Sequence, residues 1–254
     1  MARNKLVLNS DKTHLLVMAT AQNHRRHGDF NMILNTGDEL IEPIYSEKLL
    51  GGHVSNDFTW NDHIRNNEKS LFKQLTSRVN ALSKISSTMC FKTRKMMANG
   101  IIISPLIYLI QLWGGTSEYL LSFLQVIQNR AARTVTRLGW YTPVRTLMDQ
   151  CGWLSVRQLV EYHSLVLLYK IVTEGKPVYL AGKLTQDFSY DTRFAAGHGI
   201  RQDQKIKHDV MLNSFIPRTT RTWNLLPVST RMSANERIFK RRLKPWIRTR
   251  FPVT

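Results

Sequence analysis

The stretch "EYLLSFLQVIQNRAARTVTRLG" (residues 118–139) decides the fold class, because it predicts a long amphipathic helix. Its apolar residues recur at three- and four-residue spacings and therefore share one helical face: Leu120, Leu124, Ile127, Ala131, Val135 and Leu138. Arg130, Arg133 and Arg137 fall together on another side, about a third of a turn away. A helix with one apolar face must bury that face against other elements, so this stretch predicts a helical bundle.

Two further helical stretches come before this one. From Trp60 onward, apolar residues at three-, four- and seven-residue spacings predict one long amphipathic helix that ends near Ile85. A second stretch from Lys92 to Trp113 is expected to bend or break at Pro105, since proline has no N–H to donate inside a helix. Residues 59–140 are therefore predicted to form a three-helix bundle.

Residues 1–58 have a different pattern. Four short apolar runs are separated by turn residues: Leu15–Met18, Phe30–Leu34, Leu40–Ile44 and Lys48–Val54. This spacing is typical of a small antiparallel β meander. Such a region has too small a core to be stable alone, so we expect it to pack against the rest of the chain.

Residues 141–254 are less regular. "SVRQLVEYHSLVLLYKIVTEG" (155–175) predicts a helix that ends at a glycine, and a long loop is expected around residues 181–213. A short helix is then stopped by Pro227. The fold class predicted for the whole chain is α+β, mainly α, in three parts: 1–58, 59–140 and 141–254.

The last helix is predicted to begin with a capping box formed by Ser233 and Glu236. Seven of the 14 residues 237–250 are basic. Phe239, Leu243 and Trp246 recur at spacings of four and three, so the same helix also has an apolar face to bury.

The charge of the chain is strongly uneven. Its 254 residues carry a formal net charge of +18. Residues 1–60 hold 6 basic and 7 acidic side chains, residues 61–140 hold 11 and 3, and residues 141–254 hold 19 and 8. A polyanion such as nucleic acid is the natural partner of the basic part, because bound phosphates release counterions. The alternative is a basic surface that serves only solubility.

Several classes of protein find no support in the sequence. Two cysteines, Cys90 and Cys151, are too few for a disulfide framework, lack zinc-site spacing, and are expected to be buried. The apolar run 101–113 has 13 residues, whereas a membrane span needs about 20. No metal site is indicated by the eight histidines, and no glycine-rich phosphate loop is present. We expect an intracellular protein of the nucleus or cytoplasm, with no membrane partner.

Four stretches in sequence carry a family resemblance. They are "LNSDKTHLLV" (8–17), "KLLGGHVSNDFTWNDHI" (48–64), "FLQVIQNRAARTVT" (123–136), and "SFIPRTTRTWNLLP" (214–227) followed by "FKRRLKPWI" (239–247). In order and spacing they resemble the C-terminal part of reverse transcriptases from non-LTR, LINE-like retrotransposons. The resemblance implies a palm remnant with a primer-grip-like hairpin over 1–58, a thumb over 59–140 and a basic C-terminal region over 141–254.

The resemblance also implies a catalytic centre that these residues do not supply. Such polymerases hold two metal ions with palm carboxylates, and the paired-aspartate segment would precede Leu8. Only seven residues precede Leu8, and none is acidic. We therefore expect this chain alone to be inactive as a polymerase, with no cofactor and with Mg²⁺ needed only by a complete polymerase. Lys12 matches the position of a general acid, here vestigial; the alternative is a solvent-exposed lysine on a turn.

The first group of candidate nucleic-acid contacts lies in the palm and thumb regions. Gly51 and Gly52 would let the backbone approach a primer's phosphates, or they serve only the hairpin turn. Arg130, Arg133 and Arg137 could follow a phosphate backbone; the alternatives are a solvated helix face or pairing with carboxylates. Weaker candidates of the same kind are Lys69, Lys73 and Arg78.

The second group is the basic last helix. Its candidates are Arg237, Lys240, Arg241, Arg242 and Lys244, with Arg248 and Arg250 beyond them. They could form a nucleic-acid-binding arm or a cluster like a nuclear-localisation signal. The alternative is an ordinary surface helix of a basic protein.

These observations lead to three hypotheses. The first is a truncated reverse-transcriptase-like protein that binds RNA, DNA or an RNA/DNA hybrid through its thumb and tail. The second is a fragment of a working RNA-directed DNA polymerase, which would have the missing polymerase part as its partner. The third is a retroelement relic without a function.

Overall fold

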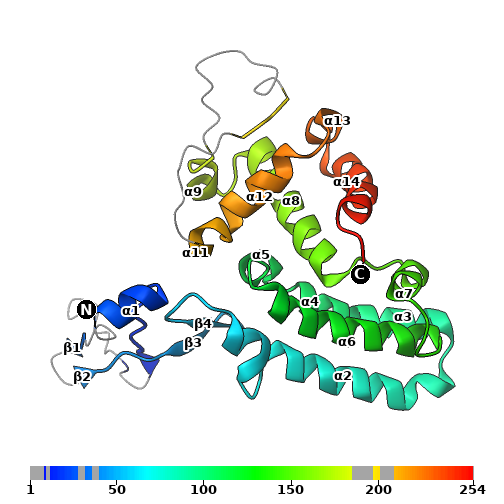
Figure 1. Cartoon of the computed structure of the whole chain (residues 1–254), viewed down its shortest axis with the longest axis horizontal. Helices are drawn as coiled ribbons and strands as arrows, with labels where there is room; N and C mark the ends of the chain where they lie inside the picture. The colour runs from blue at the N-terminus through cyan, green and yellow to red at the C-terminus, as the bar shows by residue number, and fades with distance from the viewer. Residues whose placement is uncertain are drawn as a thin grey trace. The chain divides into compact units, whose positions relative to one another are not determined.

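The computed structural model describes residues 9, 12–27, 32–35, 40–184, 197–200 and 209–253. Within them the chain is α+β and mainly α, with short antiparallel strands near the N-terminus followed by helices (Figure 1), as predicted. The chain groups into two compact units, Met1–Leu71 and Phe72–Thr254. The finer division into three parts, at residues 58 and 140, remains a prediction.

The described strands of the first unit form two antiparallel pairs. β1 (Leu34–Asn35) pairs with β2 (Leu40–Ile41), and β3 (Ser46–Leu49) pairs with β4 (Gly52–Ser55). The antiparallel pairing predicted for this region is confirmed, although the described strands form two separate pairs and not one continuous sheet.

The helix α1 (Ala21–His27) was not predicted. Its sequence "AQNHRRH" has no apolar stripe, and its first turn is held instead by Thr20, whose Oγ1 accepts from the Asn23 N–H at 3.3 Å. The predicted strand Leu15–Met18 is wrong except at Leu15, which forms an isolated bridge with Pro43. Phe30 and the predicted turns at residues 28–29 and 36–38 lie outside the described residues.

The single long helix predicted from Trp60 to Ile85 is also wrong. A π-helix, η4 (Asp62–Asn66), ends at Asn67, whose backbone is extended with ψ 150°, and α2 (Leu71–Ile85) begins after it. The Asn67 side-chain oxygen accepts from the Lys69 N–H at 2.9 Å, and the Asn67 backbone carbonyl accepts from the Ser70 N–H at 3.0 Å. The asparagine side chain stabilises a local turn that competes with the helix. The spacing of apolar residues alone does not reveal this turn.

The secondary-structure elements of the second unit, in its described residues, are all helices. After α2 come η5 (Ser86–Thr88), α3 (Phe91–Ala98), η6 (Asn99–Ile103), α4 (Ser104–Ile107), α5 (Ile110–Trp113), α6 (Glu118–Thr136), α7 (Val144–Cys151), α8 (Val156–Glu174), α9 (Val178–Ala181), α11 (Asp209–Leu212), α12 (Phe215–Asn224), α13 (Val228–Arg231) and α14 (Glu236–Arg250). The predicted stripe on α6 is confirmed, since all of its members within the helix are buried; Leu138 lies beyond the end of α6 and is half-buried.

The break predicted at Pro105 falls three residues later. The chain remains helical through Pro105, and the break comes at Tyr108, with ψ 130°, and Leu109, with φ 55°. In a regular α-helix the Pro105 N–H would bond to the Ile101 carbonyl, but proline has no N–H. Nη1 of Arg78, on α2, donates to that carbonyl at 3.2 Å, and the π-helical turn η6 comes directly before. The defect is thus accommodated without a break at the proline.

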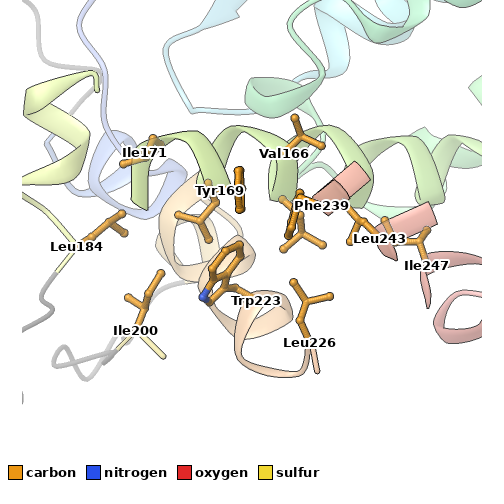
Figure 2. Close-up of a cluster of buried hydrophobic side chains, with 12 residues drawn as sticks. Val166, Tyr169, Ile171, Leu184, Ile200, Trp223, Leu226, Phe239, Leu243 and Ile247 are labelled. Carbon is orange, nitrogen blue, oxygen red and sulfur yellow. The ribbon is translucent and has the colours of Figure 1, made fainter. Parts of the chain in front are cut away.

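The core of the second unit is built around α8, which packs against α12, α14, α5 and α6 (Figure 1). Figure 2 shows Tyr169 of α8 beside Phe239 of α14 and Trp223 of α12. The Tyr169 and Phe239 rings stack with centroids 4.3 Å apart, and the Tyr169 hydroxyl donates to the Ser233 carbonyl at 2.6 Å. The helix predicted for residues 155–175 is confirmed, with a capping box of Ser155 and Gln158 at its start.

The last helix is confirmed, but its predicted cap is wrong. Asn235 caps α14 by accepting from the Ile238 N–H at 2.9 Å, whereas Ser233 is buried and donates to the Thr230 carbonyl at 2.7 Å. Phe239 and Leu243 are fully buried, as their spacing predicted, and Trp246 is half-buried.

The loop expected around residues 181–213 and the burial of the two cysteines were also predicted from the sequence. In the region expected as a long loop, residues 185–196 and 201–208 lie outside the described part, and α11 follows them. Cys151 is buried as predicted, whereas Cys90, the residue directly before α3, is exposed, so the prediction for Cys90 is wrong.

Candidate nucleic-acid interface

Lys12 lies on a turn and is exposed. Its backbone N–H donates to the Asn9 carbonyl at 3.2 Å, and the Thr13 hydroxyl donates to the same carbonyl at 2.8 Å. This geometry is that of the alternative interpretation, a lysine on a hydrogen-bonded turn. Its assignment as a vestigial general acid rests on the resemblance alone.

Gly51 and Gly52 belong to the tight turn and second strand of the β3–β4 hairpin. Gly51 has φ 88°, a conformation that favours glycine, so the hairpin itself requires this residue. Gly52 is buried and pairs with Leu49. Leu50 is 80% exposed at the tip. The turn explains Gly51 without a phosphate, and the predicted approach to a primer remains a prediction.

Arg130 and Arg133 of α6, and Arg137 directly after it, are held by neighbouring backbone and amide oxygens. Arg130 Nη2 donates to Asn80 Oδ1 at 2.8 Å, and Arg137 Nη2 donates to the Ser86 carbonyl at 2.5 Å. Arg133 Nη2 donates to the Trp140 carbonyl at 3.2 Å. None of the three has a carboxylate at ion-pair distance among the described residues, so pairing with carboxylates, one of the alternatives, does not apply within that part of the chain.

Two large aromatic side chains adjoin this row and were missed by the sequence reasoning. Trp140 is 73% exposed and Tyr141 is 97% exposed, in the turn that follows α6. The guanidinium carbon of Arg133 lies 4.8 Å from the centroid of the Trp140 ring, a cation–π contact. The available signal was the pair of adjacent aromatics in "RLGWYTP" (137–143), directly after the arginines. Exposed aromatic rings beside arginines are the elements with which proteins bind single-stranded nucleic acid.

The candidates around α2 separate into two kinds. Lys69 and Lys73 are exposed. Arg78 is half-buried and donates to the Ile101 carbonyl, so its side chain supports the helix that contains Pro105. Arg78 is therefore better explained as a structural residue than as a phosphate contact.

The basic side chains of α14 are also of two kinds. Lys240 forms an ion pair with Glu236 at 2.6 Å, and the hydrogen bond to that carboxylate raises the pKa of Lys240. Arg242 donates to the Ser229 carbonyl, and Lys244 donates to the Gly152 carbonyl at 3.3 Å. Burial, with Arg248 and Lys95 nearby, lowers the pKa of Lys244.

Arg237 and Arg241 differ from these neighbours. Both are exposed, lie one helical turn apart, and have no partner among the described residues. Within the described residues, Arg237 and Arg241, together with the exposed Arg250 at the end of α14, are the side chains of the predicted basic arm that remain available to a ligand.

The described residues contain no group of three or more histidine, cysteine, aspartate or glutamate side chains placed to hold a metal ion. Within the same part of the chain, no helix combines the length and the apolar character that crossing a membrane requires.

No protein-family model, no curated protein and no solved structure matches this chain.

Proposed function

We propose that this chain is a nucleic-acid-binding protein related to retrotransposon reverse transcriptases, without polymerase activity of its own, and that it binds single-stranded RNA or DNA on α6 and the turn after it. The observation that carries the proposal is the row of Arg130, Arg133 and Arg137 ending at the exposed rings of Trp140 and Tyr141. The family origin rests on the resemblance of the four quoted stretches.

The chemistry of these side chains supports the proposal. Each guanidinium has five N–H donors, and the intramolecular bond described for each arginine uses one of its nitrogens. Arg130 and Arg137 are exposed, so their remaining donors are available to phosphates. The Trp140 and Tyr141 rings offer faces on which bases of any sequence stack. Binding of this kind is expected to depend strongly on salt and weakly on sequence.

The test is the binding of fluorescently labelled single-stranded RNA, single-stranded DNA and RNA/DNA hybrid, measured by anisotropy over a range of salt concentrations. Replacing both Trp140 and Tyr141 with alanine should weaken single-strand binding by about tenfold or more, since stacking contributes about 1–3 kcal/mol per base. The salt slope should stay unchanged in that variant. The double variant R130Q/R137Q should instead reduce the slope by about 1–2 for a single strand.

A matched control removes the same charge elsewhere. Lys176 and Lys183 are exposed and have no partner among the described residues. K176Q/K183Q should therefore bind with nearly the wild-type salt slope. The proposal fails if the wild-type chain binds no nucleic acid at low salt, or if the aromatic variant binds a single strand as tightly as the wild type does.

The polymerase-fragment hypothesis is a second candidate, favoured by the β3–β4 hairpin, whose tight turn lies where the resemblance implies a primer grip. A primer-extension assay with Mg²⁺ tests it. We expect no product from this chain, either alone or mixed with a separate fragment that carries the fingers and catalytic palm; extension that appears only in the mixture would replace the first proposal with this one.

A further inference from the structure

A pocket of about 370 Å³ in the second unit is lined by an unusual set of charges. The segment Gly114–Glu118, which leads into α6, forms one wall, and residues of α8, α12 and α14 form the others. Among the described residues, the charged side chains on its lining are four arginines and two glutamates: Arg157, Arg218, Arg221, Arg250, Glu118 and Glu161. This balance favours an anionic occupant.

Arg218 of α12 is the least explained of these side chains. It is 6% exposed, and its Nη2 lies at 3.3 Å from Ser164 Oγ and 3.4 Å from the Gln111 carbonyl. Its Nε and Nη1 are buried and have no hydrogen-bond partner within the described part of the chain. Burial lowers the pKa of Arg218, although the charge of Glu161 opposes this shift. A buried guanidinium with unmet donors costs free energy unless an acceptor occupies the pocket.

Glu161 of α8 is a buried carboxylate that lacks a hydrogen-bond donor for one of its oxygens within the described residues. It is 1% exposed, its Oε1 lies 3.4 Å from Arg157 Nη2, and its Oε2 has no partner in the residues that the structure describes. Arg218 and Glu161 line the same pocket but do not approach within ion-pair distance of each other. A group that accepts from Arg218 and donates to Glu161 would satisfy both buried charges.

The backbone around the pocket is closely fitted. A Cβ on Gly115 would lie 2.0 Å from the Asn213 carbonyl oxygen, so only glycine allows this approach beside the pocket. Ser117 caps α6 by accepting from the Leu120 N–H, and the N-terminus of this helix favours negative charge. The end of α6 therefore supports an anion in this position.

We propose that this pocket binds a protonated phosphate group, either free hydrogen phosphate or a phosphate monoester. Its oxygens accept from Arg218 and from the exposed Arg221 and Arg250, and its O–H donates to Glu161. A guanidinium group can bind a phosphate in a bidentate way, with two of its N–H groups donating to two phosphate oxygens. A backbone phosphodiester has no O–H for Glu161, so this site differs in chemistry from the surface on α6, and it stands whether or not that surface binds nucleic acid.

The test is calorimetric titration of the full chain with sodium phosphate and, separately, with sodium sulfate at matched ionic strength. Near neutral pH sulfate has the same shape but no proton to donate. We expect saturable phosphate binding that weakens as pH rises through the second ionisation of phosphate, and sulfate binding weaker by about tenfold or more. E161Q should lose this discrimination and reverse the pH trend, because the amide N–H that replaces the carboxylate can donate to an oxygen of the dianion.

Further variants keep the proposal open to failure if E161Q does not fold. R221Q/R250Q changes two exposed side chains and should weaken phosphate binding about tenfold or more, whereas R237Q/R241Q, with the same loss of charge on the exposed part of α14, should leave it unchanged. The proposal is overturned if the wild-type chain shows no saturable phosphate binding, if sulfate binds as tightly, or if both double variants lose affinity equally.

A last comparison identifies the source of the phosphate. If a 5′-phosphorylated oligonucleotide binds more tightly than its 5′-hydroxyl form, and R221Q/R250Q abolishes the difference, the pocket receives a nucleic-acid end. If the two oligonucleotides bind equally while inorganic phosphate still binds, the ligand is a small phosphate compound.

Discussion

Arg94 illustrates how differently individual arginines are used in this basic chain. It is 5% exposed, and its Nε and Nη1 donate to the carbonyls of Val135 and Met89 at 2.8 and 2.6 Å. Arg237, by contrast, is exposed and has no partner among the described residues. A count of basic residues therefore overstates the surface available to phosphates, and the partner of each guanidinium decides its role.

His63 provides a residue-scale prediction. It is 6% exposed, and burial, with a smaller effect of the charge of His53, lowers its pKa from 6.5 to about 4. Above pH 6.5 His63 is neutral in both folded and unfolded chains and has no effect. As pH falls from 6.5 to about 4 the unfolded chain takes up a proton first, so the free energy of unfolding decreases, by up to about 3 kcal/mol.

Replacing His63 with phenylalanine removes this proton uptake. Denaturant unfolding followed between pH 7 and pH 4 should show a flatter pH dependence in the variant, whereas the contribution of the carboxylates is common to both proteins. Equal slopes in the two proteins would show that His63 is not held neutral by the fold.

At the scale of elements, local exceptions to regular helical geometry determine where the helices of the second unit begin and end. Gly175 ends α8 with φ 65°, and Arg137 ends α6 with φ 60°. The proline in α4 is accommodated by the π-helical turn before it and by an arginine from α2. Such exceptions depend on single residues, which is why the helix boundaries differ from those predicted by apolar spacing.

The contact between Arg78 and Ile101 yields an element-scale prediction. R78Q should lower the free energy of unfolding by about 1–3 kcal/mol, because the half-buried Ile101 carbonyl loses its donor. P105A restores an N–H that can bond to this carbonyl, so R78Q should cost less in the P105A background. A double-mutant cycle measured by urea unfolding gives this coupling.

Lys73 on the same helix is the control for that cycle. It is exposed and has no partner among the described residues, so K73Q should change stability by less than about 0.5 kcal/mol. Additive effects of R78Q and P105A would contradict the role given to Arg78.

At the scale of the whole molecule, the division into two compact units makes a prediction about folding. The cluster around Tyr169, Trp223 and Phe239 belongs entirely to the second unit. A shortened chain of residues 67–254, which keeps the Asn67 turn before α2, should therefore fold alone. Circular dichroism should show helix and a cooperative thermal transition within about 5 °C of one in the full chain. A shortened chain without a cooperative transition would show that the second unit depends on the first.

The amphipathic stripes on α6 and α14 were readable from the sequence because burial against a core imposes a period of 3.6 on apolar residues. The same pattern did not reveal α1 or the break at Asn67, since these depend on hydrogen bonds of single polar side chains. For the candidate interface, the sequence supplied the arginines but not their partners, and it did not single out Trp140 and Tyr141, because exposure is a property of the packed chain.

By itself, the sequence determined the fold class, the main helices and the strongly basic character of residues 61–254, because these follow from periodicity and composition. Only the tertiary structure decided which cations are engaged. It directed Arg78 to a carbonyl 23 residues away, left Arg237 and Arg241 without a partner among the described residues, and brought Arg218 and Glu161 to one pocket. The reason is physical: charge is a property of a residue, but its burial and its hydrogen-bond partner are set by elements distant in the chain.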